Sequence, residues 1–413
     1  MGLLLTNRAF ARAWAAGLSF LLAWWALHAV MLIHVFDLTG SPFATGLIPV
    51  FSSIPGIVLG PVAGGIVDRY SRPRVMTLCA LALVAILLLA LPFAGRGEVA
   101  LLYAIILIQS AVMTFFTPAE NALLPNLVHA DDLGNANALN ALNDSLGRIV
   151  GPPIGTWLLV LAGFDTVLIV TAALYLAGWG FLVGLRDTRA SLPEGSGASL
   201  RATARSFVEG FQAVRGSLPL RLLVTVSALF LLAEVPLGAV LPAFMRESVG
   251  VSAEVFGSTM SIRGLTGLLG GVLVVWLSRR VAATTLLAWG LLVHGLSFLA
   301  YGIGNSLLVS ILMLFPIGPA AAAIQTGLFT LLQQAAPDAI RGRVFALVGT
   351  VNGLTVLLTS ITAGALAEVY GTRALVIASG CLHLLPLLVA IVILRQREAS
   401  GDRLNCRKGP TAA

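Results

Sequence analysis

The stretch "GGIVDRYSRPRVM", Gly64 to Met76, interrupts a long apolar run with a dense group of charges. Its one acid, Asp68, is followed by three arginines: Arg69, Arg72 and Arg74. The apolar runs on the two sides, near 43–67 and 75–94, are each long enough for a helix to cross a hydrocarbon core, which takes about 20 residues. The pattern predicts a short charged loop that joins two membrane-spanning helices.

The composition of the whole chain agrees with a membrane location. Of its 413 residues, 58% are hydrophobic and only 10% are charged, whereas soluble domains average about 25% charged residues. A chain this apolar would expose far too much hydrocarbon surface to water. The composition therefore excludes a single soluble core.

Twelve apolar stretches have the length of a membrane span. They lie near 11–36, 43–67, 75–94, 99–121, 137–161, 163–185, 220–244, 252–277, 281–303, 306–333, 343–367 and 373–394. The first is too long for the apolar region of a secretory signal, so we interpret it as a membrane helix. The fold class expected is an all-α polytopic membrane protein.

The distribution of basic residues predicts the orientation. With the N-terminus in the cytoplasm, 20 of the 25 Lys and Arg residues fall in segments on the inner side. The outer loops hold three, Arg96, Arg246 and Arg373. This asymmetry predicts a plasma membrane protein with both termini cytoplasmic. It also accounts for the net charge of +7 through topology and anionic lipid, with no nucleic acid as partner.

The chain divides into two similar halves. We expect a six-helix bundle over 1–185, a cytoplasmic linker with an amphipathic helix over 186–219, a second bundle over 220–394 and a tail over 395–413. Gly60 and Asp68-Arg69 of the first half correspond to Gly270 and Ser278-Arg279 of the second. Two bundles related by an axis along the membrane normal are typical of one large class of transporters.

With this organisation the chain resembles the major facilitator superfamily over nearly its whole length. The loop between the second and third spans carries that superfamily's signature, here at Gly64, Asp68, Arg69, Arg72 and Arg74. The resemblance implies that this loop is a cytoplasmic gate latch, whose acid pairs with the opposite half in one conformation. Ion pairs at the membrane boundary can bias two states that differ by a few kcal/mol. A positive-inside anchor alone would explain the arginines but neither Asp68 nor the glycine.

A second motif, "LGRIVGPPIGT", resembles the antiporter motif that the superfamily's exporters carry in the fifth span. The matching positions are Gly147, Gly151, Pro152 and Gly155, while Thr156 stands where the motif has a second glycine. Glycines four residues apart also favour close helix packing in general. The stretches "NRAFARAW", "FDLTGSPFATGL", "TPAENALLPNLV" and "RGRVFAL" are similar to the drug–proton antiporter branch with macrolide and enterobactin exporters. Trp24 and Trp25 replace a Gly-Asp pair that members of that branch often have in the first span.

Ionisable residues within spans are candidates for coupling or for the cavity wall. Glu234 and Arg263 lie at similar depths in the seventh and eighth spans, so we expect an ion pair, either static or broken when Glu234 is protonated. Asp144 and Arg148 lie four residues apart on one helix face. Glu120 is expected to face the polar stripe around them and to hold helices together.

Several further polar residues are weaker candidates for the cavity. Only one of Trp24 and Trp25 is expected to face inward, because neighbours on a helix point about 100° apart. The remaining candidates are polar residues that more often bond within their own helix neighbourhood: His28, His34, His294, His383, Gln109 and Gln325.

The function expected is secondary active transport: a proton-coupled exporter of amphipathic small molecules of drug, macrolide or siderophore type. The chain has no Walker-type phosphate loop, no clustered acid, nucleophile or metal set, and no cysteine spacing that indicates a metal, so we expect no cofactor and no catalytic site. The partners expected are a small-molecule substrate, protons and the bilayer, for a functional monomer. An importer or symporter, a lipid flippase, a polytopic membrane enzyme and a non-transporting receptor are the alternatives.

Overall fold

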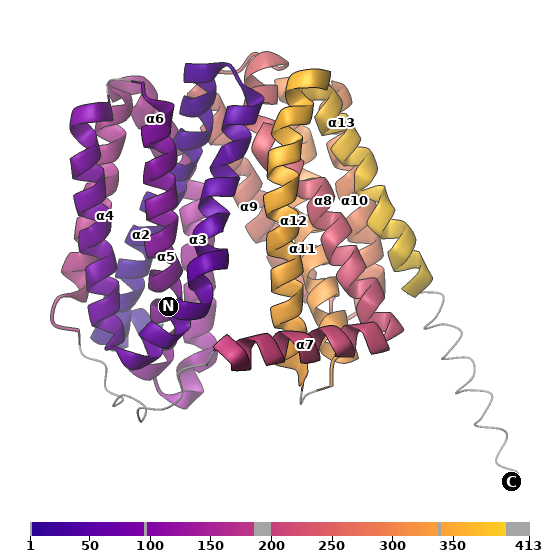
Figure 1. Cartoon of the computed structure of the whole chain (residues 1–413), viewed down its shortest axis with the longest axis horizontal. Coiled ribbons are helices and arrows are strands. Elements are labelled where there is room, and N and C mark those ends of the chain that lie inside the picture. The colour runs from indigo at the N-terminus through magenta and orange to yellow at the C-terminus, as the bar shows by residue number, and fades with distance from the viewer. Residues whose placement is uncertain (1, 95–96, 186–199, 305, 338–339, 394–413) are drawn as a thin grey trace, which may run out of the picture. The chain divides into compact units, whose positions relative to one another are not determined.

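The computed structural model describes residues 2–94, 97–185, 200–304, 306–337 and 340–393 (Figure 1). All regular elements in these ranges are helices. The first half of the chain forms α1 (Gly2–Thr6), α2 (Arg8–Thr39), α3 (Pro42–Arg69), α4 (Arg72–Ala94), α5 (Val99–Leu123), η1 (Leu124–Leu127), η2 (Ala130–Asp132) and α6 (Leu133–Leu182). The second half forms α7 (Leu200–Gly216), α8 (Leu218–Glu247), α9 (Ala253–Leu277), α10 (Ala283–Gly304), α11 (Leu307–Ala335), α12 (Arg341–Tyr370) and α13 (Thr372–Leu382).

Eleven helices of the described residues are long and apolar enough to cross a membrane. One of them, α6, has 50 residues, which would extend about 75 Å if it were straight. Its backbone departs from helical geometry at Gly163, with φ 80° and ψ 173°, a combination that essentially only glycine adopts. Because α6 therefore consists of two spans joined at Gly163, the count of twelve and the predicted boundary between 161 and 163 are confirmed.

Short polar residues mark where the spans begin. The side chains of Asn7, Ser41 and Ser306 accept hydrogen bonds from backbone N–H groups three residues further on, which caps α2, α3 and α11. Gly40 ends α2 in the left-handed conformation, with φ 61°. These caps explain why the turn between α2 and α3 takes only two residues.

The last span is interrupted in its middle. α13 ends at Leu382, His383 forms a turn, and residues 384–393 are helical again. Pro386 explains the break, because proline has no N–H group to donate to the carbonyl of Leu382. The interruption places a histidine at an irregular point within the membrane segment.

The chain folds as two compact units. The first consists of Met1–Thr203, Gly238–Leu265 and Ser360–Thr372, and the second of Ala204–Leu237, Thr266–Thr359 and Arg373–Ala413. In the core of the first unit, Phe20 stacks on Phe116 with ring centroids 3.8 Å apart. The Gln109 amide donates a 2.6 Å hydrogen bond to the hydroxyl of Tyr175. Gln109 is therefore bonded locally in the core.

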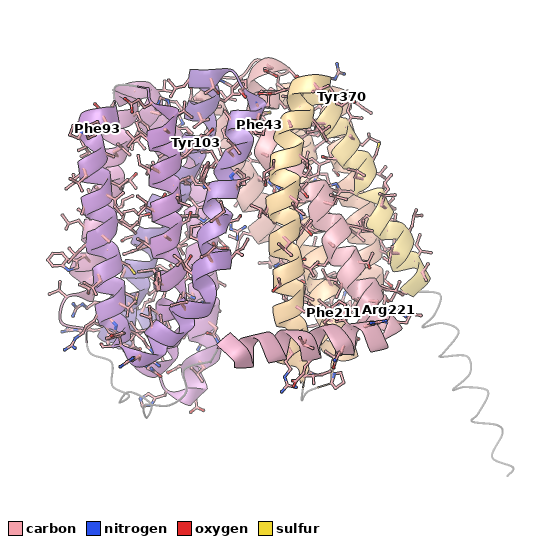
Figure 2. All side chains as sticks on the ribbon, viewed as in Figure 1. Phe43, Phe93, Tyr103, Phe211, Arg221 and Tyr370 are labelled. Atoms are coloured by element: carbon pink, nitrogen blue, oxygen red, sulfur yellow. The ribbon has the colours of Figure 1, made fainter. Side chains whose placement is uncertain are left out.

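In the second unit, α7 lies against the start of α12 (Figure 1). Glu209 of α7 forms a 2.6 Å ion pair with Arg343 of α12. A Cβ atom on Gly210 would come within 2.6 Å of the Arg343 carbonyl oxygen, so glycine is required for this approach. Phe211, labelled with Arg221 in Figure 2, is exposed on α7. The predicted amphipathic segment thus corresponds to a helix, whereas residues 186–199 of the linker and the tail from 394 lie outside the described residues.

Candidate functional site

The charged stretch that follows Gly64 joins α3 to α4. α3 ends at Arg69, Tyr70 is extended, and α4 begins at Arg72. Arg69 and Arg74 are exposed. The Asp68 side chain and the surroundings of Gly64 are outside what the structure describes. The role of this loop as a gate latch therefore stays a prediction.

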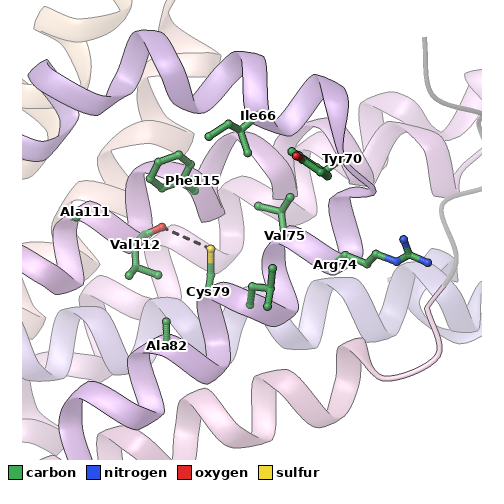
Figure 3. Close-up of a pocket in the computed structure, with 10 residues that line it drawn as sticks. Ile66, Tyr70, Arg74, Val75, Cys79, Ala82, Ala111, Val112 and Phe115 are labelled. Atoms are coloured by element: carbon green, nitrogen blue, oxygen red, sulfur yellow. Dashed lines mark hydrogen bonds between the residues drawn. The ribbon is translucent and has the colours of Figure 1, made fainter. Parts of the chain in front are cut away.

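An apolar hollow of about 470 Å³ lies beside this stretch, between α3, α4 and α5 (Figure 3). Cys79 and Phe115 line it, and the Cys79 thiol donates to the Val112 carbonyl at 3.7 Å. Figure 3 shows the Arg74 guanidinium directed away from the other lining residues. The hollow has the chemistry to hold an apolar group, and none of the predicted coupling residues lines it.

The glycine motif of α6 packs directly on the backbone of α2. Cβ atoms built on Gly151 and Gly155 would lie 2.9 Å from the Ala26 nitrogen and 2.4 Å from the Ala26 oxygen. A Cβ on Gly147 would lie 2.9 Å from the Trp25 ring. Pro152 is buried in the same stretch. The motif therefore provides a close helix–helix contact.

The same part of α6 also carries an exposed ion pair. Arg148 and Asp144 are joined by an Nη2–Oδ2 distance of 2.7 Å, and their side chains are 54% and 43% exposed. The Arg148 guanidinium also lies over the Trp25 ring, 5.0 Å from its centroid, in cation–π geometry. Trp24 instead stacks on His28. Of the two tryptophans, Trp25 is thus the one that joins the charged group.

Glu120 lies buried next to this group. Its Oε1 would be 1.8 Å from a Cβ atom on Gly17 of α2, so the carboxyl fills the space that this glycine leaves. Among the described residues, Glu120 is the only Asp, Glu, Lys or Arg that is buried. The neighbouring Asn121 accepts a 3.2 Å hydrogen bond from Asn140 of α6. The end of α5 therefore contacts α6 through Asn121 and Asn140.

Helices of the two sequence halves meet at the end of the first unit that carries Asp37, which we call the Asp37 end. Arg246 of α8 holds Asp37 of α2 with an Nη2–Oδ1 distance of 2.6 Å, and both side chains are about 30% exposed. A Cβ on Gly364 of α12 would lie 2.8 Å from the Phe43 Cα. Further along the spans, Gly264 of α9 faces the Arg148 carbonyl of α6. The first unit is thus closed at this end by backbone-level contacts and an ion pair.

Three ionisable residues converge within the second unit. Glu234 Oε2 lies 3.3 Å from His383 Nε2 and 3.7 Å from His294 Nε2. Both histidine side chains are fully buried, and that of Glu234 is 21% exposed. Arg263, the partner predicted for Glu234, belongs to the first unit, so that pair stays a prediction.

In the sequence these two histidines are isolated polar residues within separate spans, and no local pattern joins them to Glu234. The three residues do lie at similar depths along their spans, which is compatible with the grouping but does not identify it. Glu234 is 13 residues beyond Arg221, His294 is 14 beyond Arg280, and His383 is 12 before Arg395, all counted from the predicted inner side. Of the other candidates, His34 stacks on Phe164, and Gln325 is exposed on α11.

Proteins of related sequence are transporters. The chain is 28% identical over 373 residues to the multidrug efflux pump Tap of Mycolicibacterium fortuitum, covering 87% of this chain and 89% of that protein. It is 27% identical over 383 residues to the uncharacterized MFS-type transporter YfiS of Bacillus subtilis, covering 89% of each chain. It is 23% identical over 407 residues to macrolide efflux protein A of Streptococcus pyogenes, covering 94% and 96%.

Solved structures share the fold at lower identity. The nucleoside transporter NupG superposes with a TM-score of 0.77 at 16% identity, covering 93% of this chain and 99% of that one. A bacterial homologue of the iron transporter ferroportin, in its inward-facing state, gives 0.76 at 16% identity, covering 93% and 98%. At sequence identities this low, the superpositions show that the fold is shared and say nothing about function.

A chain of membrane-spanning helices whose relatives over most of its length are MFS-type transporters and efflux proteins is a multi-span membrane transporter of the major facilitator superfamily, not an enzyme. A family profile described as "Transmembrane secretion effector" matches residues 4–409. The chain belongs to this family, and the fold class expected from the sequence is confirmed.

Proposed function

We propose that this transporter exports amphipathic small molecules in exchange for protons, by alternating access and as a monomer. The observation that carries the proposal is the group of Trp25, Asp144 and Arg148 in the middle of the first unit's spans. Two relatives are named as efflux proteins, for multiple drugs and for macrolides, which supports export.

The exposure of the ion pair favours a water-filled cavity on this face. Charged side chains in contact with lipid hydrocarbon are costly, and within spans they face a bundle interior or a water-filled space. Asp144 and Arg148 remain about half exposed despite lying within α6. Trp25 adds an aromatic surface beside the guanidinium. A site with one apolar wall and one charged wall suits a molecule that has both characters.

The contacts at the Asp37 end suit one half of an alternating-access cycle. We assign this end to the outside, with both termini in the cytoplasm, because the arginine-rich segments lie at the opposite ends of the spans. In the cycle that we propose, the Asp37–Arg246 pair is formed while the outer side is closed. In the outward-facing state the Asp37–Arg246 pair opens, and the loop with Asp68 closes the cytoplasmic side.

Glu120 is our candidate for the proton carrier. A carboxyl group binds and releases a proton, and this one adjoins the polar stripe of α6. Its Oε1 makes no hydrogen bond within the part of the chain that the structure describes. Neutralisation there would change the contact of α5 with α2 at Gly17, because the carboxyl fills that space.

The test is transport by the full chain in proteoliposomes with an imposed proton gradient, using ethidium and a macrolide as probes. We expect substrate movement against the proton gradient, and loss of its dependence on the gradient in Glu120→Gln. Asn121→Asp, one residue away, is the control and keeps gradient-driven transport. Accumulation in the direction of proton flow would overturn the export proposal. A Glu120→Gln variant with unchanged gradient dependence would exclude Glu120 as the carrier.

A further inference from the structure

The three converging side chains of the second unit form a set of metal-ligand type. Glu234 comes from α8, His294 from α10 and His383 from the break that follows α13. One ligand atom from each residue lies within 4.8 Å of the others. Two imidazoles and one carboxylate are a common donor set for Zn²⁺ and other first-row divalent ions.

The spacing of these atoms fits tetrahedral coordination. With metal–ligand bonds of about 2.0–2.1 Å, two ligand atoms of a tetrahedron lie about 3.3–3.4 Å apart. The Glu234 oxygen lies 3.3 Å from the His383 nitrogen and 3.7 Å from the His294 nitrogen. The edge between the two imidazole nitrogens is at most 4.8 Å and shortens by rotation of the rings about their Cβ–Cγ bonds. The atoms are therefore within a small adjustment of a metal site.

The hydrogen bond on the far side of His383 prepares this ring for a ligand role. Its Nδ1 lies 2.7 Å from the Ser379 carbonyl oxygen. A carbonyl only accepts, so Nδ1 carries the proton, and the neutral ring then presents the Nε2 lone pair to Glu234. Metal-binding histidines almost always donate their other N–H in this way. Nε2 makes no hydrogen bond within the described residues, although it is fully buried.

Two lone pairs that face each other in a buried site call for a positive charge between them. The Nε2 of His383 and the Oε2 of Glu234 are both acceptors when the ring is neutral and the carboxyl is ionised. A proton on His383 Nε2 would supply this positive charge, but it would join only two groups, His383 and Glu234. The third donor, His294, is arranged about the same carboxylate oxygen, and a metal ion uses all three.

The backbone is built so that the two histidines can approach. A Cβ atom on Gly295 would lie 3.0 Å from the His383 Cβ, and one on Gly380 would lie 2.6 Å from the Leu299 nitrogen. Phe230 and Phe298 surround the two rings at centroid distances of 4.9–5.8 Å. An apolar wall of this kind excludes competing water from a metal site.

We infer that Glu234, His294 and His383 bind a divalent transition-metal ion of the Zn²⁺ class, with a fourth position open on the partly exposed Glu234 side. Three protein ligands with one open position are the arrangement in which Zn²⁺ takes an exchangeable group. The inference does not rest on the proposed export function, because it uses a different unit of the chain.

The test is metal binding by the full chain, purified in detergent without a polyhistidine tag and treated with a chelator. Equilibrium dialysis against Zn²⁺ with metal analysis is expected to give one tightly bound ion per chain. Glu234→Gln, His294→Gln and His383→Gln should each weaken binding about 100-fold or more, beyond the 10–100-fold typical of losing a ligand's hydrogen-bond partner. His34→Gln, a span histidine that stacks on Phe164, is the control and keeps the wild-type affinity.

A second measurement needs no variant. Co²⁺ bound in the wild-type protein should show the intense visible absorption of a tetrahedral site, which added Zn²⁺ removes. A wild-type chain that takes up no metal, or whose cobalt spectrum stays that of the hydrated octahedral ion, overturns the inference even if the variants fail to fold. Equal zinc binding by folded ligand variants overturns it as well.

Discussion

The two groups of ionisable side chains within the membrane spans differ in how they meet the cost of charge. Asp144 and Arg148 sit on one helix, four residues apart, and are about half exposed. Glu234, His294 and His383 come from three segments, and the histidines are fully buried. The first group pairs its two charges on an exposed face of one helix, whereas the polar atoms of the second group face one another across three helical segments.

This difference predicts which substitutions the exposed pair and the buried cluster each tolerate. An exposed i, i+4 ion pair contributes only about 0.3–0.5 kcal/mol to stability, so it can change without loss of the fold. A buried cluster depends on how closely its helices approach. We therefore expect substitutions at the pair to affect transport, and substitutions around the cluster to affect packing and ligand binding.

The largest expected effect is a loss of stability, caused by substitutions that disturb the helix packing behind each of the two groups. Gly155→Ala places a Cβ 2.4 Å from the Ala26 carbonyl oxygen, a backbone atom, and should destabilise the protein by about 1–3 kcal/mol. Gly295→Ala meets its nearest atoms at 3.0–3.2 Å and should cost less. Thermal unfolding in detergent measures both. The control is Gly180→Ala, also in α6, where a Cβ meets nothing within 4 Å.

An equal loss of stability in all three alanine variants would contradict this ranking. It would mean that backbone contact at Gly155 does not hold α6 on α2. A rise in stability is the expected result for Gly180→Ala, because alanine is favoured over glycine in a helix by about 0.5–1 kcal/mol.

The next effect concerns the exposed pair itself. Arg148→Gln should lower proton-driven transport of ethidium or a macrolide about tenfold, equivalent to about 1.4 kcal/mol, while the unfolding temperature stays nearly unchanged. The reason is loss of the cation that lies over Trp25 in the proposed cavity. Initial rates in proteoliposomes, together with thermal unfolding, check both parts.

The charge-swapped variant Asp144→Arg with Arg148→Asp separates two causes. It keeps an ion pair four residues apart but removes the guanidinium from position 148. We expect transport to stay low. Full recovery of transport would show that the pair acts only within its own helix. The exposed pair and the buried cluster would then no longer differ in their expected effect on transport.

The smallest effect concerns the pair at the Asp37 end. Asp37–Arg246 is less exposed, at about 30%, and joins the two sequence halves; its loss should shift the balance between states by at most about 1 kcal/mol, or about fivefold. Ser360 is fully buried beside the Gly46–Gly364 contact. In a background with the native cysteines replaced, Ser360→Cys should react up to about fivefold faster with a membrane-impermeant maleimide when Asp37→Asn is added.

Asp165→Asn is the matched control, because Asp165 is an exposed acid at the start of the predicted sixth span, next to the bend at Gly163. It should leave the labelling rate unchanged. Equal acceleration by both variants would indicate a general charge effect rather than opening of the Asp37 end.

Local patterns in the sequence predict most of the fold. The length of the apolar runs and the glycine at 163 determine the twelve spans. Both features can be recognised from residues that are neighbours in the sequence. The Asp144–Arg148 pair follows from helical spacing in the same way. The exposure of Phe93 and Tyr370, labelled in Figure 2, is also expected for helices that face lipid.

The converging histidines could not be predicted with the same ease. Their grouping depends on which helices are neighbours in space and on two glycines that let α10 and α13 approach. Span depth narrows the choice but does not identify the neighbouring helix. The packing partner of the α6 glycines, the backbone of α2 at Ala26, is likewise a tertiary property that no spacing in the sequence reveals.

Thr156, which stands where the antiporter motif has a second glycine, predicts a pattern of substitution among relatives. The Thr156 hydroxyl oxygen lies 1.9 Å from where a Cβ on Gly257 of α9 would be, so the volume that α6 gains at 156 is removed from α9 at 257. The two positions should therefore vary together across relatives. Where the residue that matches Thr156 is glycine, we expect the residue that matches Gly257 to carry a side chain, and an alignment of the family would reveal this exchange as correlated substitution.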